Sequence, residues 1–208
     1  MLSFVITIIA FCFVHVTQGE TDDPVNVSVF YESLCPDSIR FFTSQLEPTY
    51  SELRSIMTVD THAYGKASDV ADTDGEGYTF ECQHGPEECY GNKVLACGQQ
   101  YITNHNTFLE FNFCVMGAED PPSSGEECAN QVGASATDII TCANSTEGEF
   151  LLHEVGLVEA KLDPQVTYVP WIIINDEFTQ ENLDAAQEDL KALVCNTYGG
   201  TPPAACTA

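Results

Sequence analysis

Cys35 is the residue of this chain whose type and neighbours point most directly to chemistry. It follows the apolar segment VNVSVFY, residues 25–31, by a short interval, and Pro36 comes immediately after it. A cysteine between a strand and a helix lies at the helix N-terminus, where unpaired amide groups stabilise the thiolate that attacks disulfides. Asp37 acts in the opposite direction, because a nearby negative charge disfavours a thiolate. The pattern leaves two interpretations open, a redox cysteine or an ordinary half-cystine.

Ser38 stands where a two-cysteine redox motif, C-x-x-C, would place its second cysteine. In such a motif the second thiol attacks the mixed disulfide and releases the reduced substrate. A serine hydroxyl cannot do this at ordinary pH, so an outside thiol would have to resolve the intermediate. The sequence resembles a redox site whose resolving half is absent.

The segments on either side of Cys35 must hold it at the junction of a strand and a helix. Residues 25–31 alternate apolar and polar side chains and predict a strand. Apolar residues at helical spacing predict a helix that starts at Pro36, and Pro48 is expected to bend or interrupt it before Leu53. Residues 55–65 predict a second strand. This order predicts a right-handed parallel strand–helix–strand unit.

The rest of the chain completes an α/β arrangement. Residues 66–80 are polar and predict a loop, and three short cysteine-rich helices are expected at 86–102, 134–143 and 147–162. A strand, a turn at Asn175-Asp176 and a second short strand are expected within 167–180. A final amphipathic helix has apolar residues along one side at Leu183, Ala186, Leu190 and Leu193. This is the thioredoxin-like plan, with a cysteine-rich helical insertion at about 66–160 of a single domain, 20–208.

Pro170 is the second candidate for the site. In the thioredoxin plan a cis-proline before a buried strand faces the active-site cysteine, and Val169-Pro170 opens the apolar run WIII in that position. A trans proline at a strand start is the alternative. The order of elements favours a cis Val169–Pro170 bond, with Pro170 beside Cys35.

The N-terminus and the cysteine count indicate a secretory protein. Residues 1–19 are apolar, with no acidic residue, lysine or arginine, and predict a signal peptide. Of the ten cysteines, Cys12 falls in this segment, which leaves nine, an odd number. If eight pair, Cys35 is the candidate for the free thiol. Asn26 and Asn144 begin glycosylation sequons. The eight cysteines expected in disulfides are Cys82, Cys89, Cys97, Cys114, Cys128, Cys142, Cys195 and Cys206, with Cys195 expected to bridge Cys206.

Charge and spacing argue against several partners. The formal net charge is −26, with only six basic residues, which makes nucleic acid and anionic membranes poor partners. No segment after the signal peptide is apolar enough for a membrane anchor. The group Cys82, His84, Cys89 and Cys97 lacks the paired spacing of zinc modules, and residues 72–81 match only part of a calcium loop. We therefore expect no bound metal.

The segment CQHGPEECYGNKVLAC, residues 82–97, resembles the C-Q-H-G-x-x-E-C-x-x-N-x-x-x-x-C signature of the gamma-interferon-inducible lysosomal thiol reductase family. The segments YESLCPDS, HAYG, YVPWIIIN and VCNTYGGTPPAAC are also similar to that family and follow in the same order. The resemblance implies a thioredoxin-like fold, a glycosylated protein of the secretory and lysosomal route, and reduction of protein disulfides at acidic pH. It departs from the family's reductases at Ser38, where they carry cysteine.

Three hypotheses follow for function. The first is a thiol-disulfide oxidoreductase in which Cys35 attacks disulfide-containing protein substrates and a small thiol, cysteine or glutathione, resolves; no bound cofactor is expected. The second is a secreted, catalytically inactive binding protein on the same scaffold, which would interact with foreign or cell-surface proteins. The third is a disulfide isomerase or mixed-disulfide trap. The sequence does not settle oligomeric state.

Overall fold

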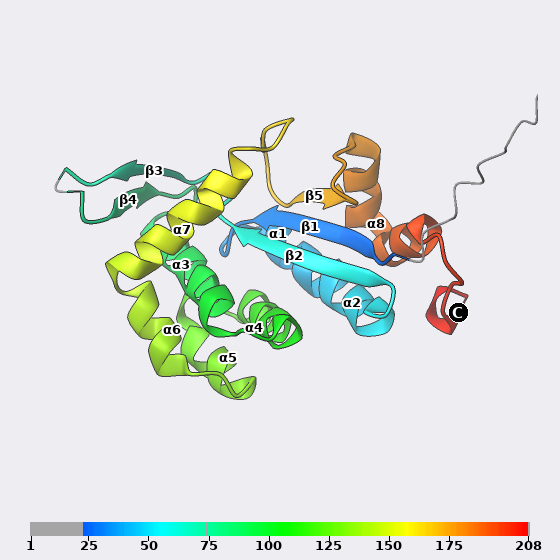
Figure 1. The fold of residues 1–208 in the computed structure, drawn as a ribbon, viewed down its shortest axis with the longest axis horizontal. Coiled ribbons are helices and arrows are strands. Elements are labelled where there is room, and N and C mark those ends of the chain that lie inside the picture. Colours follow the sequence, from blue (N-terminus) through cyan, green and yellow to red (C-terminus); the bar gives the residue numbers. More distant parts are fainter. Residues whose placement is uncertain (1–22, 74, 208) are drawn as a thin grey trace, which may run out of the picture.

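The structure, a computed structural model, describes residues 23–73 and 75–207. The expected signal peptide at 1–19 lies outside the described residues. A three-stranded sheet in the order β2-β1-β5 forms the centre (Figure 1). Its strands are β1 (Val25–Tyr31), β2 (Met57–Ala63) and β5 (Trp171–Ile174). Strand β2 pairs in parallel with β1, as the strand–helix–strand prediction requires, and β5 pairs antiparallel on the other side.

The helix that follows Cys35 runs without a break in three parts. It consists of α1 (Pro36–Phe41), the π-helical segment η1 (Phe42–Leu46) and α2 (Glu47–Leu53). Pro48 has no amide hydrogen, and its ring would collide with the preceding turn of a regular α-helix. The expected interruption takes the form of this wider turn, after which the helix continues. Phe41, Phe42 and Leu46 are buried.

The segment expected to be a polar loop at 66–80 is instead largely a β-hairpin, so that expectation was wrong. Strands β3 (Ser68–Ala71) and β4 (Tyr78–Glu81) pair antiparallel and extend away from the sheet (Figure 1). Both strands leave much of their surface in solvent, so no apolar alternation marks them in the sequence. The ring of Tyr78 stacks on His153 at 3.9 Å between centroids, which fixes the hairpin to helix α7.

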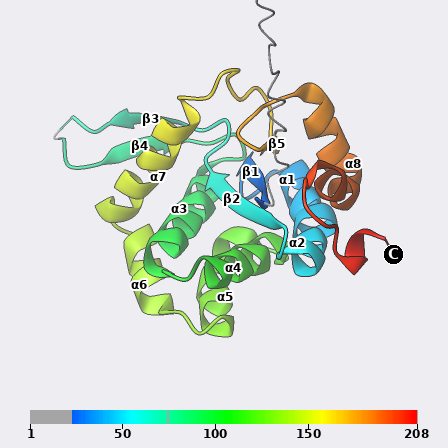
Figure 2. The ribbon, with the colours of Figure 1, turned by 45° about the vertical axis from the view of Figure 1, so that its right-hand side comes forward.

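A block of helices lies beside the β2 edge of the sheet in both views (Figures 1 and 2). The helices at α3, α6 and α7 were expected, whereas α4 and α5 were not. Helix α4 is apolar around most of its circumference, which hides the helical period, and α5 is short and polar. The elements of the block are α3 (Pro86–Tyr101), α4 (His105–Gly117), η2 (Pro121–Ser123), α5 (Gly125–Gln131), α6 (Ala136–Ala143) and α7 (Thr146–Glu159).

The C-terminal part corrects two further expectations. The second short strand after Asn175-Asp176 is only an isolated bridge between Ile174 and Glu177. Helix α8 (Gln180–Thr197) packs against β5 and η1 and is broken at Asp189, whose side chain accepts a hydrogen bond from the amide of Ala192.

The buried residues of α8 keep a helical spacing across the break. Leu183, Ala186 and Leu190 are buried as expected, but Val194 takes the place of Leu193, which is only partly buried. A short helix, η3 (Ala204–Cys206), ends the described chain.

Candidate active site

Cys35 lies at the N-cap of α1, at the end of the turn that leaves β1. Its backbone amide donates a hydrogen bond to the carbonyl oxygen of Glu32 at 3.3 Å, and its carbonyl oxygen accepts one from the amide of Ile39 at 2.9 Å. The residue is 7% exposed. Among the described residues it is the one cysteine outside a disulfide. The strand, turn and helix therefore hold a reduced thiol at the position where the sequence placed a nucleophile.

The strand that pairs antiparallel with β1 brings Pro170 to Cys35. The Val169–Pro170 peptide bond is cis, as predicted. The sulfur of Cys35 lies 3.8 Å from the carbonyl oxygen of Val169 and donates a hydrogen bond to it. Residues 134 positions apart in the chain thus form one site. A second cis bond, Asp163–Pro164, was not anticipated.

Ser38 is fully buried one helical turn after Cys35. Its hydroxyl oxygen has no hydrogen-bond partner in the part of the chain that the structure describes. A buried hydroxyl without a partner destabilises the fold compared with a paired one. The position is therefore closed to water and better suited to a weakly polar side chain than to serine.

Helix α3 supports the turn before Cys35. The side-chain oxygen of Asn92 accepts a hydrogen bond from the amide of Ser33 at 3.0 Å, and the Ser33 hydroxyl donates to the carbonyl oxygen of Glu88 at 3.1 Å. Gly91 allows this approach, because a β-carbon there would lie 2.5 Å from the Ser33 hydroxyl oxygen. The helical insertion thus positions the nucleophile, a role that sequence reasoning did not assign to Asn92.

Three buried glutamates gather behind the same turn. Glu32, Glu88 and Glu159 are each at most 7% exposed. Backbone amides of the loop after β2 hold two of them, Lys66 donating to Glu32 at 2.7 Å and Gly65 donating to Glu159 at 3.0 Å. Nothing in the apolar periodicity indicated this cluster, although the four-residue interval between Glu88 and Asn92 does put both on one face of α3.

Burial changes the ionisation of two of these groups. It raises the pKa of Glu159 to about 8, with the nearby Glu32 charge adding to the effect and the Gly65 hydrogen bond opposing it. Burial also raises the pKa of Glu32, the Lys66 amide opposes this, and the charge of Glu88 reinforces it. At acidic pH Glu159 is therefore neutral.

All eight cysteines expected in disulfides form them. The expected bridge between Cys195 and Cys206 is present, and the zinc site considered at Cys82, Cys89 and Cys97 is ruled out because these sulfurs are bonded to other cysteines. Asn144 is exposed and Asn26 partly so, and their glycosylation remains a prediction. The four pairs are Cys82–Cys89, Cys97–Cys142, Cys114–Cys128 and Cys195–Cys206.

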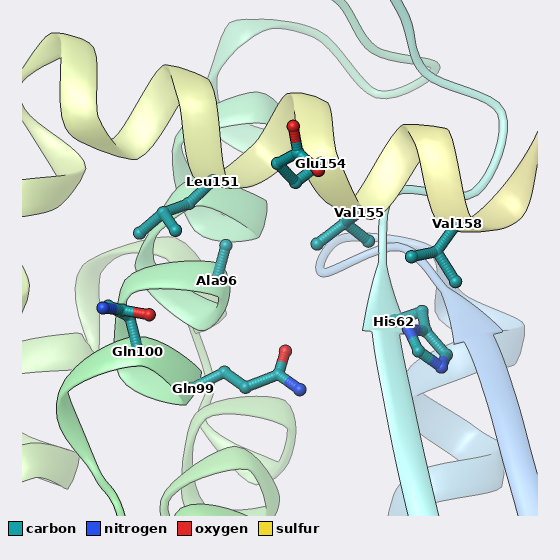
Figure 3. A pocket seen from close by; sticks show the side chains of 8 residues that line it. All are labelled: His62, Ala96, Gln99, Gln100, Leu151, Glu154, Val155 and Val158. Carbon is teal, nitrogen blue, oxygen red and sulfur yellow. The ribbon is translucent and has the colours of Figure 1, made fainter.

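A separate pocket of about 340 Å³ lies between α3, α7 and the edge of β2 (Figure 3). Figure 3 shows Val155 and Val158 on the side of α7 that faces His62 of β2. The His62 ring stacks on Phe30 with centroids 4.5 Å apart, and burial lowers its pKa. Neither Cys35 nor Ser38 lines this pocket, so it is not part of the candidate active site.

The family model for gamma interferon inducible lysosomal thiol reductase matches residues 26–132. Among curated proteins, GILT-like protein 1 of Drosophila melanogaster is 37% identical over 88% of this chain and 78% of its own length. The gamma-interferon-inducible lysosomal thiol reductase of Carassius auratus is 37% identical over 88% of this chain and 72% of its own. The chain belongs to the gamma interferon inducible lysosomal thiol reductase family. In this chain, unlike the C-x-x-C expected of such reductases, the fourth position of the motif is Ser38.

Solved structures confirm the thioredoxin-like fold. The reduced form of the disulfide bond oxidoreductase DsbG from Mycobacterium tuberculosis has a TM-score of 0.56 and 18% identity, over 93% of this chain and 88% of that one. Reduced DsbA from the same organism has a TM-score of 0.55 and 17% identity, over 92% and 93%. The family and the fold are those of thiol-disulfide oxidoreductases. No helix within the described residues is long and apolar enough to cross a membrane.

Proposed function

We propose that this chain is a monothiol oxidoreductase that reduces disulfides in protein substrates through Cys35. The observation that carries the proposal is the free Cys35 thiol at the N-cap of α1, 3.8 Å from the carbonyl oxygen that precedes cis-Pro170. With Ser38 in the resolving position, the second thiol comes from outside the chain. Cysteine or glutathione would serve, and no other cofactor is needed.

The reaction balances with two external thiols. The Cys35 thiolate attacks one sulfur of the substrate disulfide, forms a mixed disulfide and displaces the other sulfur as a thiolate that takes up a proton. A small thiolate then attacks the Cys35 sulfur, which releases the second substrate thiol and leaves Cys35 joined to the small thiol. A second small thiolate restores Cys35, so that one substrate disulfide is reduced while two small thiols are oxidised to one disulfide.

A hollow that Gly65 lines, close to the side chain of Val169, supports a protein substrate. It has a volume of about 390 Å³, and Lys66, Leu157 and Val166 contribute to its lining. The hollow borders the site because a β-carbon at Gly65, which also lines it, would lie 3.0 Å from the Val169 side chain and 2.5 Å from that of Glu32. An extended peptide that occupies the hollow would bring its disulfide toward Cys35.

An acidic compartment of the secretory and lysosomal route is the setting that we propose. The support is the net charge of −26 together with Glu159, whose pKa of about 8 keeps this buried carboxyl neutral at acidic pH. Relatives whose names include "lysosomal thiol reductase" add to that support.

Insulin reduction at acidic pH, with and without added cysteine, tests the proposal. The protein with cysteine should reduce insulin well above the rate of cysteine alone, and Cys35→Ser should return the rate to that background. Rapid alkylation during turnover should trap a mixed disulfide, visible as a mass equal to the protein plus one insulin chain. A rate equal to the background for the unaltered protein would overturn the proposal.

The alternative is an inactive binding protein, and the low exposure of Cys35, 7%, is the observation that favours it. A thiol this covered reacts with a large substrate only if the covering segments move. Denatured insulin bound stoichiometrically by both the unaltered protein and Cys35→Ser, without reduction by either, would select this alternative.

A further inference from the structure

A cluster of ligand-type side chains, separate from the Cys35 thiol, consists of His84, Glu32 and Glu88. One ligand-type atom from each residue, two carboxylate oxygens and the Nδ1 atom of the imidazole, lie within 4.8 Å of one another. The His84 Nδ1 atom is 2.5 Å from one oxygen of Glu88 and 3.3 Å from one oxygen of Glu32. The three residues come from two distant segments: Glu32 from the turn after β1, and His84 and Glu88 from the turn before α3 and the first turn of that helix.

In each carboxylate of this cluster, one oxygen accepts a hydrogen bond from a backbone amide and the other oxygen faces the imidazole of His84. Glu32 uses Oε1 to accept the Lys66 amide at 2.7 Å, and Glu88 uses Oε1 to accept the His84 amide at 3.0 Å. The remaining oxygen of each, Oε2, is the one that faces His84 Nδ1. Ligands fixed through their second atom are typical of metal sites, where outer hydrogen bonds orient the coordinating groups.

A disulfide bond restrains the cluster, and one side chain of the cluster reaches solvent. The Cys82–Cys89 disulfide closes the loop that carries His84 and Glu88, which limits the movement of both. Both carboxylate side chains are completely buried, whereas the His84 side chain is 32% exposed. An ion could therefore enter past the imidazole, and water could fill a remaining coordination position.

A second observation concerns the Oε2 atom of Glu32, whose ion-pair neighbour among the described residues is His84 Nδ1 at 3.3 Å. The Oε2 atom of Glu32 has no hydrogen-bond partner in the described residues, although Glu32 is 0% exposed. A buried carboxylate oxygen without a partner is costly unless an ion or a proton compensates it. We propose that Glu32, His84 and Glu88 bind a divalent metal ion of the zinc class.

The ligand types select this class. Imidazole nitrogen suits zinc and its neighbours, and two carboxylates complete three protein ligands of a four-coordinate ion. Zinc–nitrogen and zinc–oxygen bonds of about 2.0–2.2 Å place ligand atoms less than about 4 Å apart, so small side-chain rotations suffice. The ion would cross-link the turn before Cys35 to α3, because the Glu32 carbonyl oxygen also accepts the Cys35 amide.

Zinc titration of untagged, chelator-treated protein at pH 7 tests the proposal. The experiment uses a Cys35→Ser background, because the free thiol is itself a zinc ligand. Isothermal titration calorimetry should give one site per chain, and Glu32→Gln and Glu88→Gln should each weaken the affinity by at least about tenfold. His153→Ala is the matched control, since His153 also pairs through Nδ1 with a carboxylate, Asp69, at 2.8 Å but belongs to no such three-residue cluster among the described residues. Its affinity for zinc should not change.

X-ray absorption of the zinc-loaded Cys35→Ser protein gives a readout that needs no substitution in the cluster itself. We expect a first shell of nitrogen and oxygen only, with one imidazole. Absence of a stoichiometric site in the titration, a sulfur ligand in the spectrum, or equal affinity in the glutamate variants and in His153→Ala would each overturn the proposal. Disulfide mapping of every variant should give the same four bridges. If a variant lacks them, its affinity is left out of the comparison and the X-ray absorption spectrum decides.

Discussion

The amide of Ser33 donates a 3.0 Å hydrogen bond to the side-chain oxygen of Asn92, and both residues are completely buried. This bond joins the helical insertion to the turn that ends at Cys35. The insertion is therefore part of the mechanism that positions the thiol, because α3 holds the turn both through this bond and through the Ser33 hydroxyl, which donates to the carbonyl oxygen of Glu88.

Asn92→Ala should loosen the active-site turn. The change leaves the buried Ser33 amide without its partner, which costs about 1–3 kcal/mol of stability. Alkylation of native Cys35 by iodoacetamide should also become several-fold faster, because the turn carries this buried residue and a looser turn would expose its thiol more often. Asn112→Ala is the control: Asn112 is equally buried and bonds Tyr31 and Thr61. It should lower stability without changing the alkylation rate, and equal acceleration in both variants would contradict the proposed role of Asn92.

Gly65→Ala should destabilise the protein more than an alanine at another left-handed glycine. Gly65 has φ of 64°, and a β-carbon there would lie 2.5 Å from the Cγ atom of Glu32. Gly133 has a similar φ of 73° with nothing within 4 Å. Gly133→Ala should therefore cost about 1–2 kcal/mol for conformation alone, and Gly65→Ala a further 1–3 kcal/mol or so for overpacking. Urea unfolding measures both, and equal losses would refute the close packing against Glu32.

Glu159→Gln should change how stability depends on pH. The unfolded chain loses this proton near the ordinary pKa of 4.5, whereas the folded protein keeps it up to about pH 8. Between these values the folded state binds more protons than the unfolded state, so stability falls as pH rises through this window. Each unit of separation corresponds to about 1.4 kcal/mol.

The glutamine variant retains an acceptor for the Gly65 amide but does not ionise. In chelator-containing buffer it should match the parent near pH 4.5 and exceed its unfolding free energy at pH 8. Asp69→Asn is the comparison variant for these pH profiles, because it neutralises a different carboxylate, one that pairs with His153. Parallel pH profiles for Glu159→Gln and the parent protein would exclude Glu159 as the titrating group.

The sequence predicted the parts of the site that depend on local pattern and chain order. Cys35 and cis-Pro170 followed from a strand-to-helix junction and from the place of the WIII segment in the fold. Glu32, Glu88 and Asn92 did not, because their roles arise from contacts between the β1 turn and α3, more than 50 residues apart in the chain. The hairpin at β3–β4 was missed for another reason, since its strands bury little and carry no apolar alternation.

Ser38→Cys should convert the site to one that resolves its own mixed disulfide. The two thiols would be one helical turn apart on the same face, at i and i+3. Attack by the second thiol would be intramolecular, with an effective concentration far above that of a free small thiol. Insulin reduction should then lose much of its dependence on the concentration of added cysteine, although an outside reductant is still needed to regenerate the enzyme.

Stability gives a second, independent measurement on the same variant. The Ser38 hydroxyl is buried without a partner, and a thiol is nearly isosteric and less polar. The reduced Ser38→Cys protein should therefore be as stable as the parent or slightly more stable. Ser33→Cys is a useful contrast, because it removes a hydroxyl that does donate a hydrogen bond, to the carbonyl oxygen of Glu88. If the Ser38→Cys protein forms its new disulfide yet reduces nothing in excess reductant, the substrate surface has been lost as well. The inactive binding protein would then be the correct account of this chain.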